Sequence, residues 1–161
     1  LKLEMPDFFK DVHKSHEIIY SKSLEYYFKN ELELTDDVSE SFKEFVNRGS
    51  VWSSNDFMKE QRNQLKNIQT FSSFVDKSNV DFILSPAVHG VAPMLEEEEL
   101  NDLSLLWTYL HCPSVTIPVD KCEEYSLPLG LNLSASRFND INLINFVNEY
   151  FDKRPYDFSV T

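Results

Sequence analysis

The period of the hydrophobic pattern changes at Val80, and this change constrains the fold more than any other feature of the sequence. Before Val80, apolar residues recur every three to four positions, as in amphipathic helices. After it come three short runs typical of strands, and then one more helical pattern. Helices, then strands, then a closing helix predict an α/β fold. The expected helices cover 8–30, 37–47, a stretch with apolar positions from Met58 to Val75, and a stretch from 140 onward, and the expected strands cover 80–86, 114–119 and 127–134.

Local signals predict several helix ends. Asp7 is expected to cap the first helix and Gly49 to stop the second. Ser53 and Ser54 are both N-cap candidates for the third helix, and Pro155 is expected to end the last. From helical spacing, the inward positions are expected to be Val12, Ile19, Leu24 and Tyr27 in the first helix, Met58, Leu65, Ile68, Phe71 and Val75 in the third, and Leu143, Ile144, Val147 and Phe151 in the last.

The strand patterns predict a small sheet. The run 80–86 is nearly all apolar and ends at Pro86, so we expect a strand buried on both faces. The runs 114–119 and 127–134 are separated by a polar stretch and are typical of an antiparallel hairpin. The segment 1–5 alternates apolar and polar residues and is expected to be a short strand. A sheet of three or four strands is too small to enclose a strand that is buried on both faces, so we expect further strands of the sheet outside this sequence.

Composition indicates one domain over 1–161, with a helical part at 7–76 and a part at 80–153 that holds the strands, the hairpin and the closing helix. The formal net charge of -12 disfavours nucleic acid and anionic membrane as partners. No apolar run approaches the roughly 20 residues of a transmembrane helix. The start has no signal-peptide anatomy, and the two cysteines are too few for a disulfide framework. We therefore expect a cytoplasmic protein, and the first residue, which is not Met, indicates that the native start lies elsewhere.

Four blocks resemble segments of the amidase-signature family. The stretch 81–93 (DFILSPAVHGVAP) is similar to the family's D-hydrophobic-L-(T/S)-P segment that ends in A-P. The stretch 106–118 (LWTYLHCPSVTIP) resembles W-T-x-L-x-x-P-x-V-x-x-P, and 127–133 (LPLGLNL) resembles L-P-x-G-x-Q-x. The helix from Asp140 is similar to the closing D-x-x-L-L-x-x-A element. The blocks follow the family's order, and with the preceding helices they cover most of the chain.

The resemblance implies the C-terminal portion of an α/β/α sandwich, with a mixed sheet flanked by helices. It also implies amide hydrolysis by a Ser nucleophile, a bridging Ser in a cis peptide and a Lys base, without a metal or cofactor. In the family the two serines lie in a Gly-Gly-Ser-Ser-Gly-Gly type segment, whose backbone N–H groups approach the oxyanion. This sequence has only three glycines, Gly49, Gly90 and Gly130, each isolated. No position therefore matches the catalytic residues, and none is assigned.

The resemblance suggests four substrate-binding residues: His89, Trp107, Thr108 and Asn132. It implies that the loop after the first strand and the segment around Trp107 and Thr108 lie near the acyl-binding pocket. Asn132 stands where relatives often carry Gln. His89, Trp107 and Asn132 each have a structural alternative, which is respectively a solvated loop residue, a core aromatic residue, and an amide that satisfies local backbone groups.

Other chemically suggestive residues are expected to be structural. His13 and His16 share a helix face, but without a second pair of ligands they predict no metal site. The run Glu96 to Glu99 is typical of a solvated turn. Cys112 precedes a proline in an apolar context, which predicts a buried, unreactive thiol.

The leading hypothesis is the C-terminal part of an amidase-family hydrolase that cleaves non-peptide carboxamide C–N bonds when complete and is inactive alone. Its substrate would be a small amide, and the chain would self-associate or pair with the missing N-terminal part. One alternative is a catalytically inactive, stand-alone amidase-like binding domain. Another is the A subunit of a glutamyl-tRNA(Gln) amidotransferase, which requires a carboxylate in the helix before Trp107. Asp102 is near that position, but Asn101 falls on it.

Overall fold

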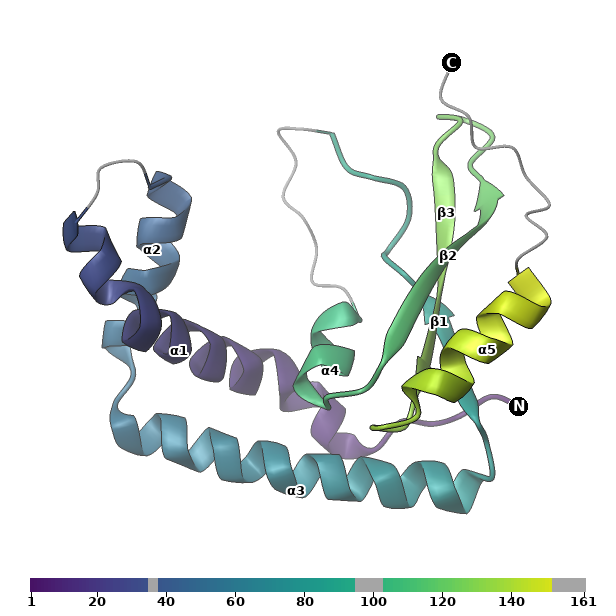
Figure 1. Cartoon of the computed structure of the whole chain (residues 1–161), viewed down its shortest axis with the longest axis horizontal. Helices are drawn as coiled ribbons and strands as arrows, with labels where there is room; N and C mark the ends of the chain where they lie inside the picture. The colour runs from purple at the N-terminus through teal and green to yellow at the C-terminus, as the bar shows by residue number, and fades with distance from the viewer. Residues whose placement is uncertain (35–37, 95–102, 152–161) are drawn as a thin grey trace. The chain divides into compact units, whose positions relative to one another are not determined.

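The computed structural model describes residues 1–34, 38–94 and 103–151 (Figure 1). It divides into two compact units, Leu1–Gln69 and Thr70–Thr161, which are taken in turn. The expectation that 1–161 is one domain stays a prediction. The elements are η1 (Asp7–Asp11), α1 (Val12–Leu34), α2 (Glu40–Arg48), η2 (Gly49–Val51), α3 (Ser54–Ser78), β1 (Phe82–Pro86), α4 (Ser104–Tyr109), β2 (Ser114–Lys121), β3 (Pro128–Ala135) and α5 (Asp140–Phe151).

The N-terminal unit is helical, as expected, but its first residues differ from the prediction. Residues 1–6 have no regular structure, so the expected strand at 1–5 is wrong. Strand-like alternation cannot form a strand without a partner, and the sheet comprises β1, β2 and β3 only among the described residues. Asp7 is not a cap: it is the first residue of η1, and its carboxylate pairs with the Lys10 ammonium at 2.7 Å. In α1 Val12 and Ile18 are buried, whereas Tyr27, which was expected inward, is exposed.

Gly49 ends α2 where the sequence predicts, but for a different reason. Its φ of -58° is right-handed, so it does not supply the left-handed turn of a glycine cap. Instead η2 begins there and packs against α1. A Cβ at Gly49 would lie 2.3 Å from the Ser21 carbonyl oxygen and 2.5 Å from Glu25 Cβ. The glycine is therefore required by close packing between the two elements.

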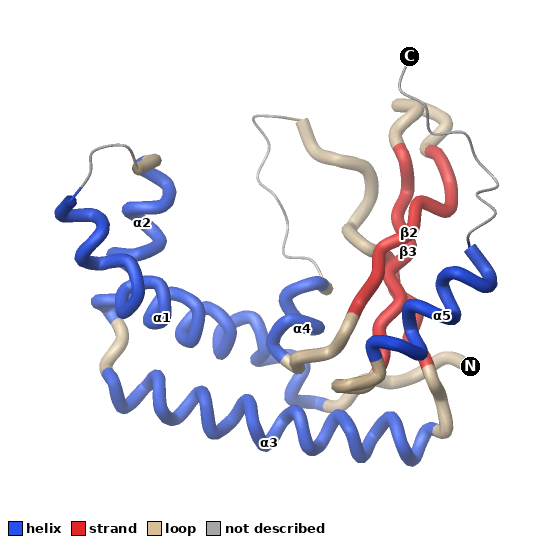
Figure 2. Tube along the Cα trace, in the orientation of Figure 1, coloured by secondary structure: helices blue, strands red, loops and turns tan. Residues whose placement is uncertain are grey.

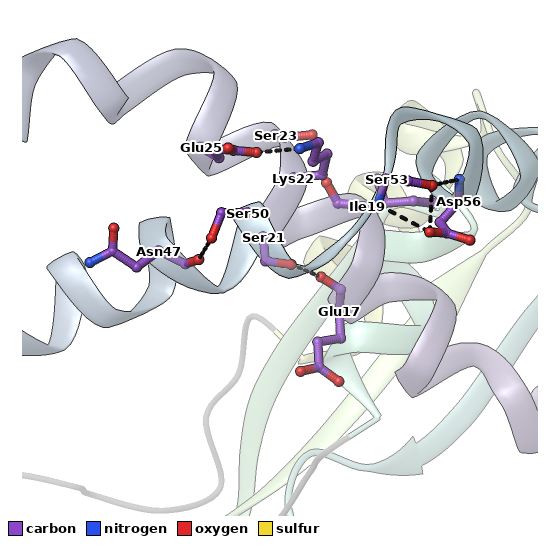
Figure 3. A network of polar contacts seen from close by, with 10 residues as sticks. All are labelled: Glu17, Ile19, Ser21, Lys22, Ser23, Glu25, Asn47, Ser50, Ser53 and Asp56. Atoms are coloured by element: carbon purple, nitrogen blue, oxygen red, sulfur yellow. Dashed lines mark hydrogen bonds and ion pairs between the residues drawn. The ribbon is translucent and has the colours of Figure 1, made fainter.

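A reciprocal cap opens α3 at one of the two expected serines (Figure 3). Ser53 Oγ accepts a hydrogen bond from the Asp56 backbone N–H at 3.1 Å, and Asp56 Oδ2 accepts one from the Ser53 backbone N–H at 3.0 Å. These bonds satisfy donors that a helix start leaves free. Of the expected inward residues of α3, Ile68, Phe71 and Val75 are buried. Met58 and Leu65 are exposed, so only the C-terminal part of the apolar stripe of α3 is buried.

The second unit is built on a three-stranded antiparallel sheet in the order β1-β3-β2, with the strands shown red in Figure 2. The expected hairpin is confirmed as β2 paired with β3. The register places Leu84, Leu133 and Val115 in one row across the sheet, and Ser85, Asn132 and Thr116 in the next. Because neighbouring residues of a strand point to opposite faces, these two rows belong to opposite faces.

One face of the sheet carries the apolar core of this unit. Leu133, Ala135 and Leu143 are buried there, and partly buried apolar residues of the strands and α5 pack around them: Phe82, Val115, Ile117, Leu131, Phe146, Val147 and Phe151. Two expected positions are not covered: Ile144 of α5 is exposed, and Leu84 of β1 is 60% exposed. The prediction that the first strand is buried on both faces is therefore wrong for the described chain, whereas the predicted α/β fold is confirmed.

Candidate functional site

The other face of the sheet is polar and holds the candidate site. Its centre is Asn132 on β3, with Ser85 of β1 directly opposite on one side and Thr116 of β2 on the other. Thr116 Oγ1 donates to Asn132 Oδ1 at 3.2 Å, and Asn132 Nδ2 donates to Ser134 Oγ at 2.8 Å. Asn132 and Ser134 are only 6% and 1% exposed. We call Ser85, Thr116, Asn132 and Ser134 the polar row.

Two buried polar atoms of this unit have no hydrogen-bond partner in the described chain: Ser85 Oγ, in the polar row, and Trp107 Nε1, on α4. Figure 1 shows α4 on the side of the sheet away from α5, which is the side of the polar row. A buried polar group without a partner costs about 1–3 kcal/mol. Such groups are therefore suited to accept or donate a bond to a molecule that completes the site.

The glycine at position 130 fixes the path of the chain as it leaves β1. The Ala87 backbone N–H donates to the Gly130 carbonyl oxygen at 3.0 Å, which extends the β1–β3 pairing into the loop. A Cβ on Gly130 would lie 2.9 Å from Ala87 Cβ and 3.0 Å from Thr116 Cγ2. A larger residue would push this loop, which carries His89, away from the end of the polar row.

The four residues predicted to bind substrate separate into a buried pair and an exposed pair. Trp107 is 1% exposed, and its ring centroid lies 6.0 Å from that of Phe71 on α3. Asn132 is buried in the polar row. His89, in the loop after β1, and Thr108, on α4, are exposed. Their role in binding substrate stays a prediction.

Sequence reasoning missed the other members of the polar row. Ser85, Thr116 and Ser134 were treated only as strand residues, although each is a small hydroxyl residue in an otherwise apolar strand. The signal was available: Thr116 alternates with Val115 and Ile117, and Ser134 follows Asn132 at a spacing of two. Period-two spacing puts such residues on one face. What sequence could not supply was the register that joins the three strands.

The side chains of the polar row can donate and accept hydrogen bonds. The polar row contains hydroxyl and amide groups and no titratable side chain, so it has no general base of its own. Cys112 lies just before β2 in the sequence. Burial raises the pKa of its thiol to about 12, with a smaller opposing effect from a backbone hydrogen bond at Arg137. A thiol with that pKa is protonated at neutral pH and is not a nucleophile.

No metal site or membrane span is seen in the parts of the chain that the structure describes. Within residues 1–34, 38–94 and 103–151, no three His, Cys, Asp or Glu side chains gather as metal ligands. His16, one of the two histidines considered above, has its pKa lowered, chiefly by burial and also by the charge of His13. No helix over these same residues is long and apolar enough to cross a bilayer. Glu96 to Glu99, Asn101, Asp102 and Pro155 lie outside the described residues.

The helical unit has a separate hollow of about 620 Å³ beside α1. It is lined by Lys22, Ser23, Glu25, Tyr26, Tyr27, Lys29, Asn30, Ser54, Phe57 and Gln61. Lys22 Nζ and Glu25 Oε2 form an ion pair at 2.5 Å within this lining, and Figure 3 shows the two side chains together. The hollow thus contains an ion pair among aromatic and amide groups. We assign no reaction to this hollow.

Comparison with known proteins places this fold. No model of a protein family and no curated protein matches the chain. Solved structures do match. An amidase aligns with 86% of this chain and 34% of its own, at 17% identity and a TM-score of 0.71. Fatty acid amide hydrolase aligns with 94% of this chain and 33% of its own, at 18% identity and a TM-score of 0.66.

A third match is the allophanate hydrolase of Kluyveromyces lactis, which aligns with 94% of this chain and 26% of its own, at 14% identity and a TM-score of 0.68. At such identities the likeness shows the fold alone. The chain therefore has the fold of one part of these hydrolases and spans about a third of their length or less. The α/β arrangement expected from the resemblance is confirmed at this level.

Proposed function

We propose that this chain is the C-terminal part of an amidase-like hydrolase, and that it hydrolyses carboxamides only when the rest of that enzyme is present. The observation that carries the proposal is the structural match: 86% of this chain aligns with 34% of an amidase. Four sequence blocks in the family's order support it independently. The substrate class is a small carboxamide, and the composition supports a cytoplasmic location without nucleic acid or membrane as a partner.

In this proposal the chain binds and orients substrate, while the catalytic groups belong to residues outside the sequence. The three isolated glycines provide no Gly- and Ser-rich segment, and the polar row lacks a base that would activate a serine. His89, Trp107, Thr108 and Asn132 are assigned to the wall of the acyl pocket. The unpartnered Trp107 Nε1 is a donor suited to a polar group brought in by the complete enzyme.

The test is amide hydrolysis by the purified 161-residue chain, compared with the longer protein translated from the native reading frame. Release of ammonia from primary carboxamides and of nitroaniline from acyl nitroanilides is measured with both proteins. We expect the 161-residue chain to match the buffer blank and the longer protein to turn over substrate. Turnover that rises linearly with the concentration of the 161-residue chain, and that is lost in Ser85→Ala, would refute the proposal.

A second measurement separates binding from catalysis in the longer protein. Trp107→Phe removes the indole donor while it keeps an aromatic ring in the buried position, and Asn132→Ala removes the central amide of the polar row. If these residues line the acyl pocket, both changes alter the dependence of KM on the acyl group. Unchanged KM values across a series of acyl groups would contradict the assignment.

A further inference from the structure

Gly130 lies on β3 between two parts of the candidate site, the polar row and the loop after β1. It is two residues before Asn132, so a side chain at this position would lie on the same face of the sheet as the polar row. On one side, its carbonyl oxygen accepts the hydrogen bond from Ala87 at the start of the loop. On the other side, it lies opposite Pro118 of β2. It therefore borders both β2 and the loop.

The space around Gly130 is limited sideways, in the plane of the sheet. A Cβ there would lie 2.9 Å from Ala87 Cβ and 3.0 Å from Thr116 Cγ2. Among the described residues, apart from the chain neighbours of Gly130, no third heavy atom lies within 4 Å of that Cβ position. The φ of Gly130 is not left-handed, so the backbone itself does not require glycine. Glycine is needed because a methyl group would press on one neighbour at each side.

The neighbour on the β1 side can yield only by moving its backbone. The Cβ of Ala87 is attached directly to the main chain and has no rotamer that would take it away from position 130. A methyl group at Gly130 would therefore displace the main chain of Ala87 and strain its hydrogen bond of 3.0 Å to the Gly130 carbonyl oxygen. His89 follows two residues later, so the displacement would be passed to the loop that carries it.

The neighbour on the β2 side is tied to the central amide of the polar row. Thr116 Oγ1 donates to Asn132 Oδ1 at 3.2 Å, and Thr116 Cγ2 faces position 130. Both atoms are bonded to the same Cβ and turn together about χ1, which is stiff in a β-branched residue. Moving Cγ2 away would therefore carry Oγ1 away from Asn132, whose side chain is buried. The glycine thus also maintains the orientation of the Asn132 amide.

We propose that Gly130 is a positioning residue that sets two parts of the acyl pocket at once: the loop after β1, through Ala87, and the Asn132 amide, through Thr116. The inference rests on the proposed function, which assigns His89 and Asn132 to that pocket. It adds the residue that fixes the place of both. Gly130 has no side chain of its own to contact substrate and acts through its two neighbours.

Amide hydrogen exchange and NMR of the 161-residue chain follow the two effects separately. In Gly130→Ala we expect the Ala87 amide to exchange about tenfold faster or more, because its hydrogen bond is strained. We also expect the side-chain NH2 resonances of Asn132 to shift. The Ala135 amide donates to the Pro113 carbonyl oxygen at 3.1 Å at the opposite end of β3, and it should keep its wild-type exchange rate.

Two compensating changes test which neighbour carries each effect. Ala87→Gly removes the Cβ at 2.9 Å, and Thr116→Ser removes Cγ2 while it keeps the hydroxyl group. Combined with Gly130→Ala, the first should restore the exchange rate of the amide at position 87, and the second should restore the Asn132 resonances. Each double variant is compared with its compensating change alone, so that the effect of that change is subtracted. A readout that Gly130→Ala leaves unchanged, or that its compensating change does not restore, overturns the proposal.

Amide hydrolysis by the longer protein from the native reading frame tests the consequence for the acyl pocket. Gly130→Ala should raise KM by roughly three- to tenfold at unchanged kcat, the equivalent of about one lost hydrogen bond to the acyl group. The triple variant with Ala87→Gly and Thr116→Ser should recover most of this loss. Gly49→Ala is the matched control, because it creates the same kind of clash in the helical unit and should lower Tm without changing KM.

The positioning role and the proposed function can fail separately. Hydrolysis by the longer protein with an unchanged KM in Gly130→Ala, even if Tm falls, refutes only the positioning role. A longer protein without hydrolytic activity refutes the proposed function. The exchange rates and resonances of the 161-residue chain then still decide whether Gly130 sets the loop and the Asn132 amide.

Discussion

Gly49 lies where η2 passes closest to α1, and replacing it with alanine tests how tightly the helical unit is packed. Its φ of -58° suits any residue, so alanine introduces no backbone strain. In a helical conformation alanine is favoured over glycine by about 1 kcal/mol. If the surroundings were open, Gly49→Ala would therefore stabilise the protein.

The surroundings are not open, and this reverses the expected sign. The added Cβ would lie 2.3 Å from the Ser21 carbonyl oxygen, a backbone atom that cannot rotate away, and 2.5 Å from Glu25 Cβ. Forcing an extra carbon into a packed site costs about 1–3 kcal/mol. Since both contacts are far inside normal separations, we take about 3 kcal/mol as the cost. After the propensity gain, the net loss is about 2 kcal/mol, or roughly 4–8 °C in Tm for a chain of this size.

Urea and thermal unfolding followed by far-ultraviolet circular dichroism measure this loss. Gly90→Ala is the matched control, because a Cβ there would meet nothing within 4 Å, and Gly90 has no left-handed φ. We expect no loss for Gly90→Ala, and a gain of up to about 1 kcal/mol from a less flexible unfolded chain. A Gly49→Ala protein as stable as the wild type would show that η2 and α1 do not approach so closely, and the reasoning would fail.

Two further predictions concern the polar row and the pH dependence of the helical unit. Asn132→Ala should cost about 1–3 kcal/mol in urea unfolding, because Ser134 loses its buried partner. Thr116→Val, which removes one bond at an exposed position, should cost less, and equal losses would argue against a central role for Asn132. Burial, and to a smaller extent the charge of His13, lower the pKa of His16 below the 6.5 that is usual for histidine, so the unfolded chain binds the proton more readily. Stability should therefore be retained above about pH 6.5 and decrease as the pH drops below it. We expect Tm to decrease less between pH 7.5 and pH 5.5 in His16→Gln than in the wild type. An equal decrease of Tm in the two proteins would contradict this reasoning.

Sequence reasoning was accurate where the cause of a structure is local. The N-cap Ser53 and its partner Asp56 are three residues apart, and the signal needs no tertiary contact. The hairpin of β2 and β3 was readable for a similar reason, since two strand patterns separated by a short polar stretch tend to pair. The blocks around Trp107 and Asn132 also indicated a fold that the structural matches confirm.

The candidate site was only partly predictable, because it depends on register. Asn132 was identified, but its partners Ser85 and Thr116 come from strands at other positions in the chain. A shift of one residue in either pairing would have turned those hydroxyl groups to the other face. The sequence shows which residues share a strand face; the pairing decides which residues of different strands meet.

By itself, the sequence determined the type and order of most elements and the phase of their apolar stripes; the exceptions were the strand wrongly expected at 1–5 and the short helix α4, which was not among the expected helices. Only the tertiary structure decided which parts of those stripes are covered, because burial requires a second surface that the periodicity of one element does not describe. Leu133 and Leu84 are both leucines in apolar strand patterns and lie opposite each other in one row of the sheet. Leu133 is buried on the central strand β3, whereas Leu84 is exposed on the edge strand β1. Gly49 shows the same division: sequence located the helix end, and the approach of η2 to α1 determined why a glycine is needed there.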